Sequence, residues 1–173
     1  MNQGFEQAKA QRNWLERLGA KIPGFGGFLD RELRRDVDKR QREYLAGEVG
    51  RIKETLRSKA RAYSDAGQMA ALESIERIEK KLDGLGQTIR FADYGASGLF
   101  DVEKIREDQL DRLYEFDVQW VEALAQLRAE VEGLPATAEN PMAALDGVLA
   151  HLEALAAHWA KRAQVISSVL QSK

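Results

Sequence analysis

The apolar residues of this chain recur at alternating spacings of three and four, and this pattern constrains the fold more than any other feature. It is clearest between Leu110 and Leu134, where the spacing continues without interruption. Such spacings place side chains on one face of an α-helix, because the helix has about 3.6 residues per turn. Similar patterns occur in residues 30–62, 68–89 and 142–170. The sequence therefore predicts four long amphipathic helices.

The composition and the connections between these stretches indicate how the helices pack. Only three prolines occur among 173 residues, and 44% of the residues are hydrophobic while 31% are charged. Short connections separate the helices, at residues 64–67, 90–101 and 135–141. Long helices with short connections pack most simply as antiparallel neighbours. We expect an all-α protein, an elongated antiparallel four-helix bundle in a single domain that spans residues 1–173.

The first part of the chain, residues 1–28, differs from the bundle expected over residues 29–171. Apolar side chains from Phe5 to Leu18 fall at helical spacing, which predicts an additional N-terminal amphipathic helix. Two interpretations of this segment stay open. It packs on the bundle, or Phe5, Trp14 and Leu18 contact a membrane surface while basic residues face the headgroups.

A glycine-rich loop, residues 22–28, follows this helix. It contains Pro23, three glycines and two aromatic side chains, Phe25 and Phe28. A phosphate-binding loop requires a preceding strand and a Gly-Lys-Ser/Thr ending, and this loop has neither. We interpret it as a turn whose aromatic residues pack on the bundle or contact a partner.

Asp117 is an acidic residue within the apolar row of the fourth predicted helix. A lone buried carboxylate is costly, so a buried Asp117 requires a cationic partner. The candidates are Arg90, from the central connection, and Arg35, from the basic start of the second helix. The main hypothesis is a buried ion pair that fixes the helix register. Exposure at a bundle end and a ligand-binding role are the alternatives.

The central connection, residues 90–101, interleaves aromatic residues with two glycines. Phe91, Tyr94 and Phe100 supply apolar anchors, while Gly95 and Gly98 interrupt the helix. We interpret the connection as the break between two helical hairpins. It becomes a candidate protein-binding site if its aromatic side chains are exposed.

The residue types that carry most enzyme chemistry are absent or isolated. The chain has no cysteine, and its two histidines are seven residues apart, whereas helical metal pairs are four apart. Ser97 lacks the flanking glycine and the strand of a nucleophile elbow. The arginines of the second helix are interspersed with acids, which does not favour nucleic-acid binding. We expect no metal, no cofactor and no enzyme activity.

Three stretches together carry a resemblance to a known family. They are residues 22–28, residues 31–38, and residues 89–101 with their continuation at 113–117. On these, the chain resembles a family of uncharacterised bacterial cytoplasmic proteins that often accompany SPFH (band 7) membrane-scaffold proteins. The resemblance spans roughly residues 10 to 120. It implies an accessory or interaction role near membrane-associated assemblies, and no catalytic residue.

These observations lead to two hypotheses about function. The first is a non-enzymatic interaction or adaptor protein that binds an unidentified protein through Phe25, Phe28, Phe91, Tyr94 and Phe100. The second is a peripheral membrane-surface protein that uses residues 5–28. A cytoplasmic location is expected, because the first residues lack an apolar leader and no apolar run reaches the roughly 20 residues of a spanning helix. Monomer and homodimer both remain open.

Overall fold

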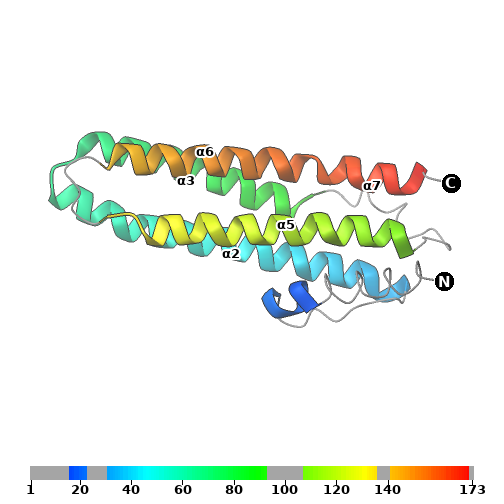
Figure 1. The fold of residues 1–173 in the computed structure, drawn as a ribbon. Helices are drawn as coiled ribbons and strands as arrows, with labels where there is room; N and C mark the ends of the chain where they lie inside the picture. The colour runs from blue at the N-terminus through cyan, green and yellow to red at the C-terminus, as the bar shows by residue number, and fades with distance from the viewer. Residues whose placement is uncertain (1–15, 23–30, 93–106, 136–140, 172–173) are drawn as a thin grey trace.

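The computed structural model describes residues 16–22, 31–92, 107–135 and 141–171 (Figure 1). These residues form helices and the short turns between them, and no strand occurs within the described ranges, which confirms the predicted all-α class. Residues 16–21 are helical. The named helices are α2 (Arg31–Asp65), α3 (Met69–Arg90), α5 (Glu107–Glu132), α6 (Met142–Ala160) and α7 (Arg162–Gln171).

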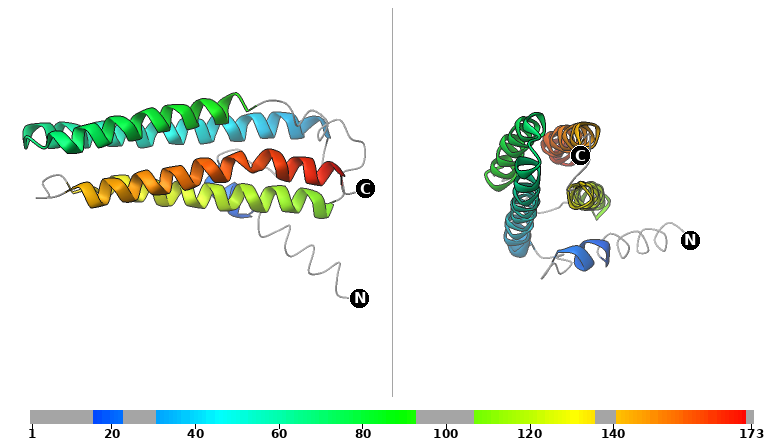
Figure 2. Two further views of the ribbon diagram at one scale, coloured as in Figure 1. Left: turned by 90° about the horizontal axis from the view of Figure 1, so that it is seen from above. Right: turned by 90° about the vertical axis from the view of Figure 1, so that its left-hand side faces the viewer.

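The long helices lie side by side in two antiparallel pairs. α2 runs against α3, and α5 runs against α6, with both connections at the same end of the molecule (Figures 1 and 2). The turn between α2 and α3 is made by Gly67, whose φ is 70°. Glycine adopts this left-handed backbone conformation without steric cost. The amide of Gln68 donates to the carbonyl of Tyr63 at 2.9 Å, which closes the end of α2.

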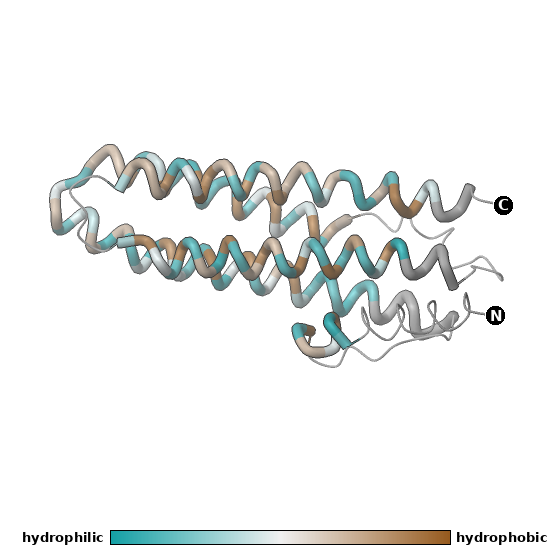
Figure 3. Tube along the Cα trace, viewed as in Figure 1, coloured by the Kyte–Doolittle hydropathy of each residue, from teal (hydrophilic) through white to brown (hydrophobic). Residues whose placement is uncertain are grey.

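The core lies along the inward faces of these helices. Hydrophobic and hydrophilic residues alternate along each helix, as amphipathic helices require (Figure 3). Trp120 is fully buried, and its indole N–H donates to the carbonyl of Leu155 at 3.1 Å. The Trp120 ring also meets the ring of Trp159 edge to face, with centroids 4.9 Å apart. These contacts hold α5 against α6, and each such large side chain contributes about 1.5–3 kcal/mol by burial.

The last predicted helix is two helices in the structure. A single turn at Lys161 separates α6 from α7, and the amide of Lys161 donates to the carbonyl of His158 at 3.0 Å. Such a bond spans three residues rather than four, so the helix tightens locally. No proline or glycine marks the position. The prediction of one continuous helix over residues 142–170 was therefore wrong at this turn, which directly precedes Arg162.

α3 is much shorter than its neighbour α2, with 22 residues against 35. The C-terminal end of α3, which is the end far from the turn at Gly67, reaches only partway along α2 (Figure 1). The carbonyl groups of its last turn need partners there, because no further helical amides follow. The polar side chains that gather at this point form the candidate site.

Candidate functional site

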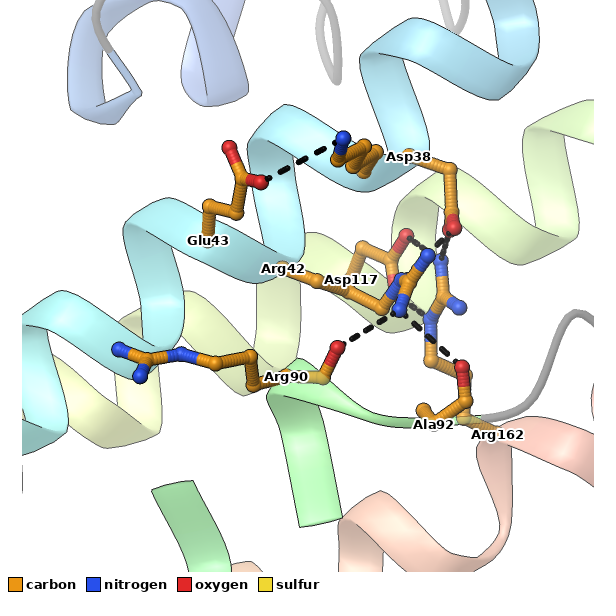
Figure 4. A network of polar contacts seen from close by, with 8 residues as sticks. Asp38, Arg42, Glu43, Arg90, Ala92, Asp117 and Arg162 are labelled. Atoms are coloured by element: carbon orange, nitrogen blue, oxygen red, sulfur yellow. Dashed lines mark hydrogen bonds and ion pairs between the residues drawn. The ribbon is translucent and has the colours of Figure 1, made fainter. Parts of the chain in front are cut away.

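A polar cluster joins three helices at the end of α3. Its members are Asp38 and Arg42 from α2, Asp117 from α5 and Arg162 from the first position of α7 (Figure 4). All four side chains are largely buried. The exposed fraction of the side chain is 12% for Asp38, 6% for Arg42, 0% for Asp117 and 8% for Arg162. Two aspartates and two arginines balance in charge, which lowers the cost of placing them in the core.

Arg162 lies at the centre of the cluster. Its Nε and Nη2 atoms donate to the two carboxylate oxygens of Asp117 at 2.8 and 3.0 Å. Nη2 also donates to Asp38 at 2.9 Å. Its guanidinium carbon lies 5.3 Å from the ring centroid of Trp159. A two-bond contact between guanidinium and carboxylate fixes both groups in one plane, so Arg162 sets the position of α7 against α5 and α2.

The surroundings of Arg162 keep it charged. Burial alone would lower its pKa, because an apolar environment disfavours a cation. The charges and hydrogen bonds of Asp117 and then Asp38 outweigh burial, and together they raise the pKa above its ordinary value. Arg162 is therefore a fixed positive charge at the centre of the cluster.

Arg42 connects the cluster to the end of α3. Its Nε donates to Asp38 at 2.9 Å, and its Nη1 donates to the carbonyl oxygens of Arg90 and Ala92, each at 3.1 Å. Carbonyls at a helix C-terminus carry partial negative charge and lack intrahelical partners. A guanidinium supplied by α2 therefore caps α3 from outside the helix.

The structure corrects the predicted partner of Asp117. Asp117 is buried, and the cation bound to it is Arg162, which is neither of the two predicted candidates. Arg90 is exposed and its side chain points away from Asp117 (Figure 4), while its carbonyl takes part in the cap. Arg35 belongs to α2, but its side chain lies outside the described residues.

The missed members of the cluster do carry a signal in the sequence. The buried row of α6 runs 145, 148, 152, 155 and 159, so strict alternation places Arg162 next, followed by Ile166. Ala163, which also lies about one turn after Trp159, is exposed instead. In α2, the buried row traced back from Val49 through Leu45 reaches Arg42 and then position 38 by the same alternation.

The central connection is described only at its beginning. Phe91 is 70% exposed, although it is a large aromatic residue. Its amide donates to the carbonyl of Gln87 at 2.9 Å, so its backbone still belongs to the end of α3. Tyr94 and Phe100, the other predicted contacts of this stretch, lie outside the described residues.

The N-terminal segment packs on the helices over its described part. Leu18 and Ile22 are buried, with exposed fractions of 0% and 3%, and they belong to the main core cluster. Leu18 is therefore not a membrane contact in this structure, because its side chain is already covered by protein. The other residues assigned to membrane or partner contact here lie outside the described ranges; they are Phe5, Trp14, Phe25 and Phe28.

Further groups that could perform chemistry are few in the described part of the chain. No set of three or more metal-binding side chains converges there. His151 contacts Glu130 at 3.0 Å, and His158 lies edge to face with Phe116, with ring centroids 4.4 Å apart. The two histidines thus lie in separate environments. Across the same described residues, no helix has both the length and the apolar character needed to cross a membrane.

No protein family, curated protein or solved structure was found to match this chain.

Proposed function

We propose that this chain is a non-enzymatic protein-interaction protein, and that it binds a partner protein at the end of α3 with Phe91 as the central contact. The observation that carries the proposal is the 70% exposure of this phenylalanine. Aromatic side chains are enriched at the centres of protein interfaces, where covering them yields a large share of the binding energy. An exposed phenylalanine at a fixed position suits this role.

The cap of α3 supports the proposal because it holds the backbone on both sides of Phe91. Arg42 binds the carbonyls of the preceding and following residues at 3.1 Å each, and Asp38 holds the guanidinium in turn. A side chain on a fixed backbone loses less freedom on binding than one on a mobile loop. In this proposal the buried cluster serves as a support for the contact surface, not as a catalytic site.

We also infer the finer architecture, an antiparallel four-helix bundle with an additional N-terminal helix. The pairing of α2 with α3 and of α5 with α6 supports it, with α7 extending α6 as the fourth arm. Residues 16–21 then represent the described part of the additional helix. In such a bundle α3 is the short arm, and its end leaves Phe91 at the surface.

Site-specific photo-crosslinking in the native cell tests the proposed contact. A benzophenone amino acid replaces Phe91 in one variant and Met69 in the other, because Met69 is nearly as exposed, at 66%, and begins the same helix. We expect a discrete crosslinked protein from position 91 and none from position 69. Crosslinks of equal yield at both positions, or none at either, would contradict the proposal. Matching thermal unfolding of the two variants controls for folding.

A further inference from the structure

α7 is a short arm that is attached to the rest of the molecule at few points. It begins directly after the tightened turn at Lys161, and it packs against α5. Within residues 162–168, where the exposure of α7 is described, only Arg162 and Ile166 are buried. Segments with few buried side chains open locally at a lower free energy than the core. This construction allows α7 to release as a unit, with the turn at Lys161 as its hinge.

One of these two attachments belongs to the charged cluster. Arg162 donates to Asp117 at 2.8 Å and to Asp38 at 2.9 Å. Asp38 also accepts a hydrogen bond from Nε of Arg42 at 2.9 Å, so the two guanidinium groups meet at one carboxylate (Figure 4). Arg42 in turn holds the carbonyls that precede and follow Phe91. A continuous series of hydrogen bonds therefore runs from α7 to the backbone around Phe91.

The charge balance of the cluster depends on α7. With Arg162 in place, two arginines face two aspartates. Release of α7 leaves Asp38 and Asp117 with Arg42 as the only cation among the described members of the cluster. A buried carboxylate without a cation is costly. The guanidinium of Arg42 is then drawn towards the aspartates and away from the uncharged carbonyls of α3, or water enters the cluster, and either change weakens the cap.

We propose that docking of α7 controls the contact surface at Phe91, because α7 and the cap of α3 hold or release together. Docked α7 keeps the cluster neutral and the backbone around Phe91 fixed, whereas released α7 loosens that backbone. The coupling rests on the cluster alone, and its consequence for partner binding rests on the proposed function. Coupling between two sites acts in both directions. A partner that covers Phe91 on its fixed backbone therefore favours docked α7.

Amide hydrogen exchange in full-length variants tests the coupling. Ile166→Glu places a charge in the buried contact of α7 and changes no member of the cluster, so it should release α7. We expect faster exchange in α7 and also at the amides of Phe91 and Ala92, the latter by about 5- to 150-fold. Ser167→Glu is the matched control, because it adds the same charge at the adjacent exposed position and should change neither region. The amide of Ile78, a fully buried residue of α3, reports any global loss of stability.

Three outcomes of this experiment would overturn the inference. α7 could exchange faster while Phe91 and Ala92 keep their parent rates, which would show that the two regions are independent. α7 could keep its parent rate, which would show that it does not release at this contact. All the amides, including that of Ile78, could accelerate equally, which would show that α7 does not open as a separate unit. If Ile166→Glu unfolds the chain, the milder Ile166→Ala decides by the same readouts.

A second substitution tests the charge mechanism. Asp117→Asn in the Ile166→Glu chain removes the carboxylate that would be left without a cation, and Asp38 then balances Arg42. Exchange in α7 should stay fast, whereas Phe91 should return to nearly its parent rate. Fast exchange at Phe91 in this double variant would contradict the role of charge balance in the coupling.

Photo-crosslinking separates the coupling from the proposed function. A chain with the benzophenone amino acid at position 91 and Ile166→Glu should give less crosslinked partner than a chain with the same amino acid and native Ile166. If the chain with native Ile166 gives no crosslink, the proposed function fails, and hydrogen exchange still decides the coupling. Equal crosslink yields from the two chains, together with faster exchange at Ala92, would overturn the control of binding by α7.

Discussion

α2 caps the C-termini of two other helices with cationic side chains, and the two caps are built differently. At one end, Arg42 binds two carbonyls of the α3 terminus, each at 3.1 Å. At the other end, Lys59 binds two carbonyls of the α5 terminus at 3.0 and 2.9 Å. Both caps satisfy carbonyls that lack helical partners. Only the first connects to a buried cluster of charges.

The difference shows what burial demands of a charged cap. Lys59 keeps contact with water and has a neutral helper, Tyr63, whose hydroxyl donates to the carbonyl of Pro135 at 2.6 Å. Arg42 is only 6% exposed, and its charge is balanced by Asp38. That carboxylate is shared with Arg162, so the cap at the α3 terminus is linked to the position of α7. The cap near the hairpin connections stands apart from this cluster.

Arg162→Met should produce the largest effect. The substitution leaves the carboxylate of Asp117 buried without its cation, and breaking a buried pair on one side costs about 3–5 kcal/mol of unfolding free energy. Urea unfolding at pH 7 measures the loss. Lys161→Met is the matched control, because Lys161 is the adjacent exposed residue, and it should change stability by less than about 0.5 kcal/mol. Equal losses of unfolding free energy from the two substitutions would contradict the claim that the ion pair of Arg162 with Asp117 stabilises the fold.

Arg42→Met should rank second. It removes a charged donor from two carbonyls of α3, and hydrogen bonds of this kind contribute about 1.5–3 kcal/mol. Amide hydrogen exchange should accelerate at Phe91, because the backbone around it loses its support. The equivalent change at the other cap, Lys59→Met, should cost about 1 kcal/mol or less, because water replaces the lost donor. If Lys59→Met lost more unfolding free energy than Arg42→Met, the proposed difference between the two caps would be wrong.

Tyr63→Phe tests the neutral helper near the hairpin connections. The substitution keeps the buried ring and removes one hydroxyl donor, so unfolding free energy should fall by about 1 kcal/mol. Burial raises the pKa of Tyr63, which keeps the hydroxyl protonated and able to donate. Chemical denaturation measures the change. A loss of unfolding free energy as large as that of Arg162→Met would contradict the described difference between the cap at the α5 terminus and the charged cluster at the α3 terminus.

The smallest expected effect is a pH dependence at His158. Burial, and then the charge of Lys161, lower the pKa of His158 in the folded protein. The unfolded chain therefore binds a proton more readily, and stability should fall as the pH drops below about 6.5, the ordinary histidine value. His158→Gln should flatten the stability profile between roughly pH 7.5 and 5.5. An unchanged slope would show that this histidine does not contribute to the pH dependence.

The sequence predicted the helices well and the polar cluster only in part. The spacing of apolar residues located the helices, because burial of one face imposes the helical period on hydrophobic residues. It also marked Asp117, a charge within an apolar row. The partner was not predicted, because the candidate cations were only Arg90 and Arg35, and the turn at Lys161 that precedes Arg162 has no sequence marker. The arrangement of helices, which places the Arg162 side chain within reach of Asp38 on α2, was needed to identify Asp38 as a member.

The most direct test of the central claim is a double-mutant cycle on Asp117 and Arg162. The claim is that these two charges act as one buried unit that positions α7 on α5. Asp117→Leu, Arg162→Met and the double variant are compared with the parent by urea unfolding. We predict a large loss for Arg162→Met and recovery of most of that loss in the double variant, because no unpaired charge then remains between these two positions. Losses that simply add would contradict the claim.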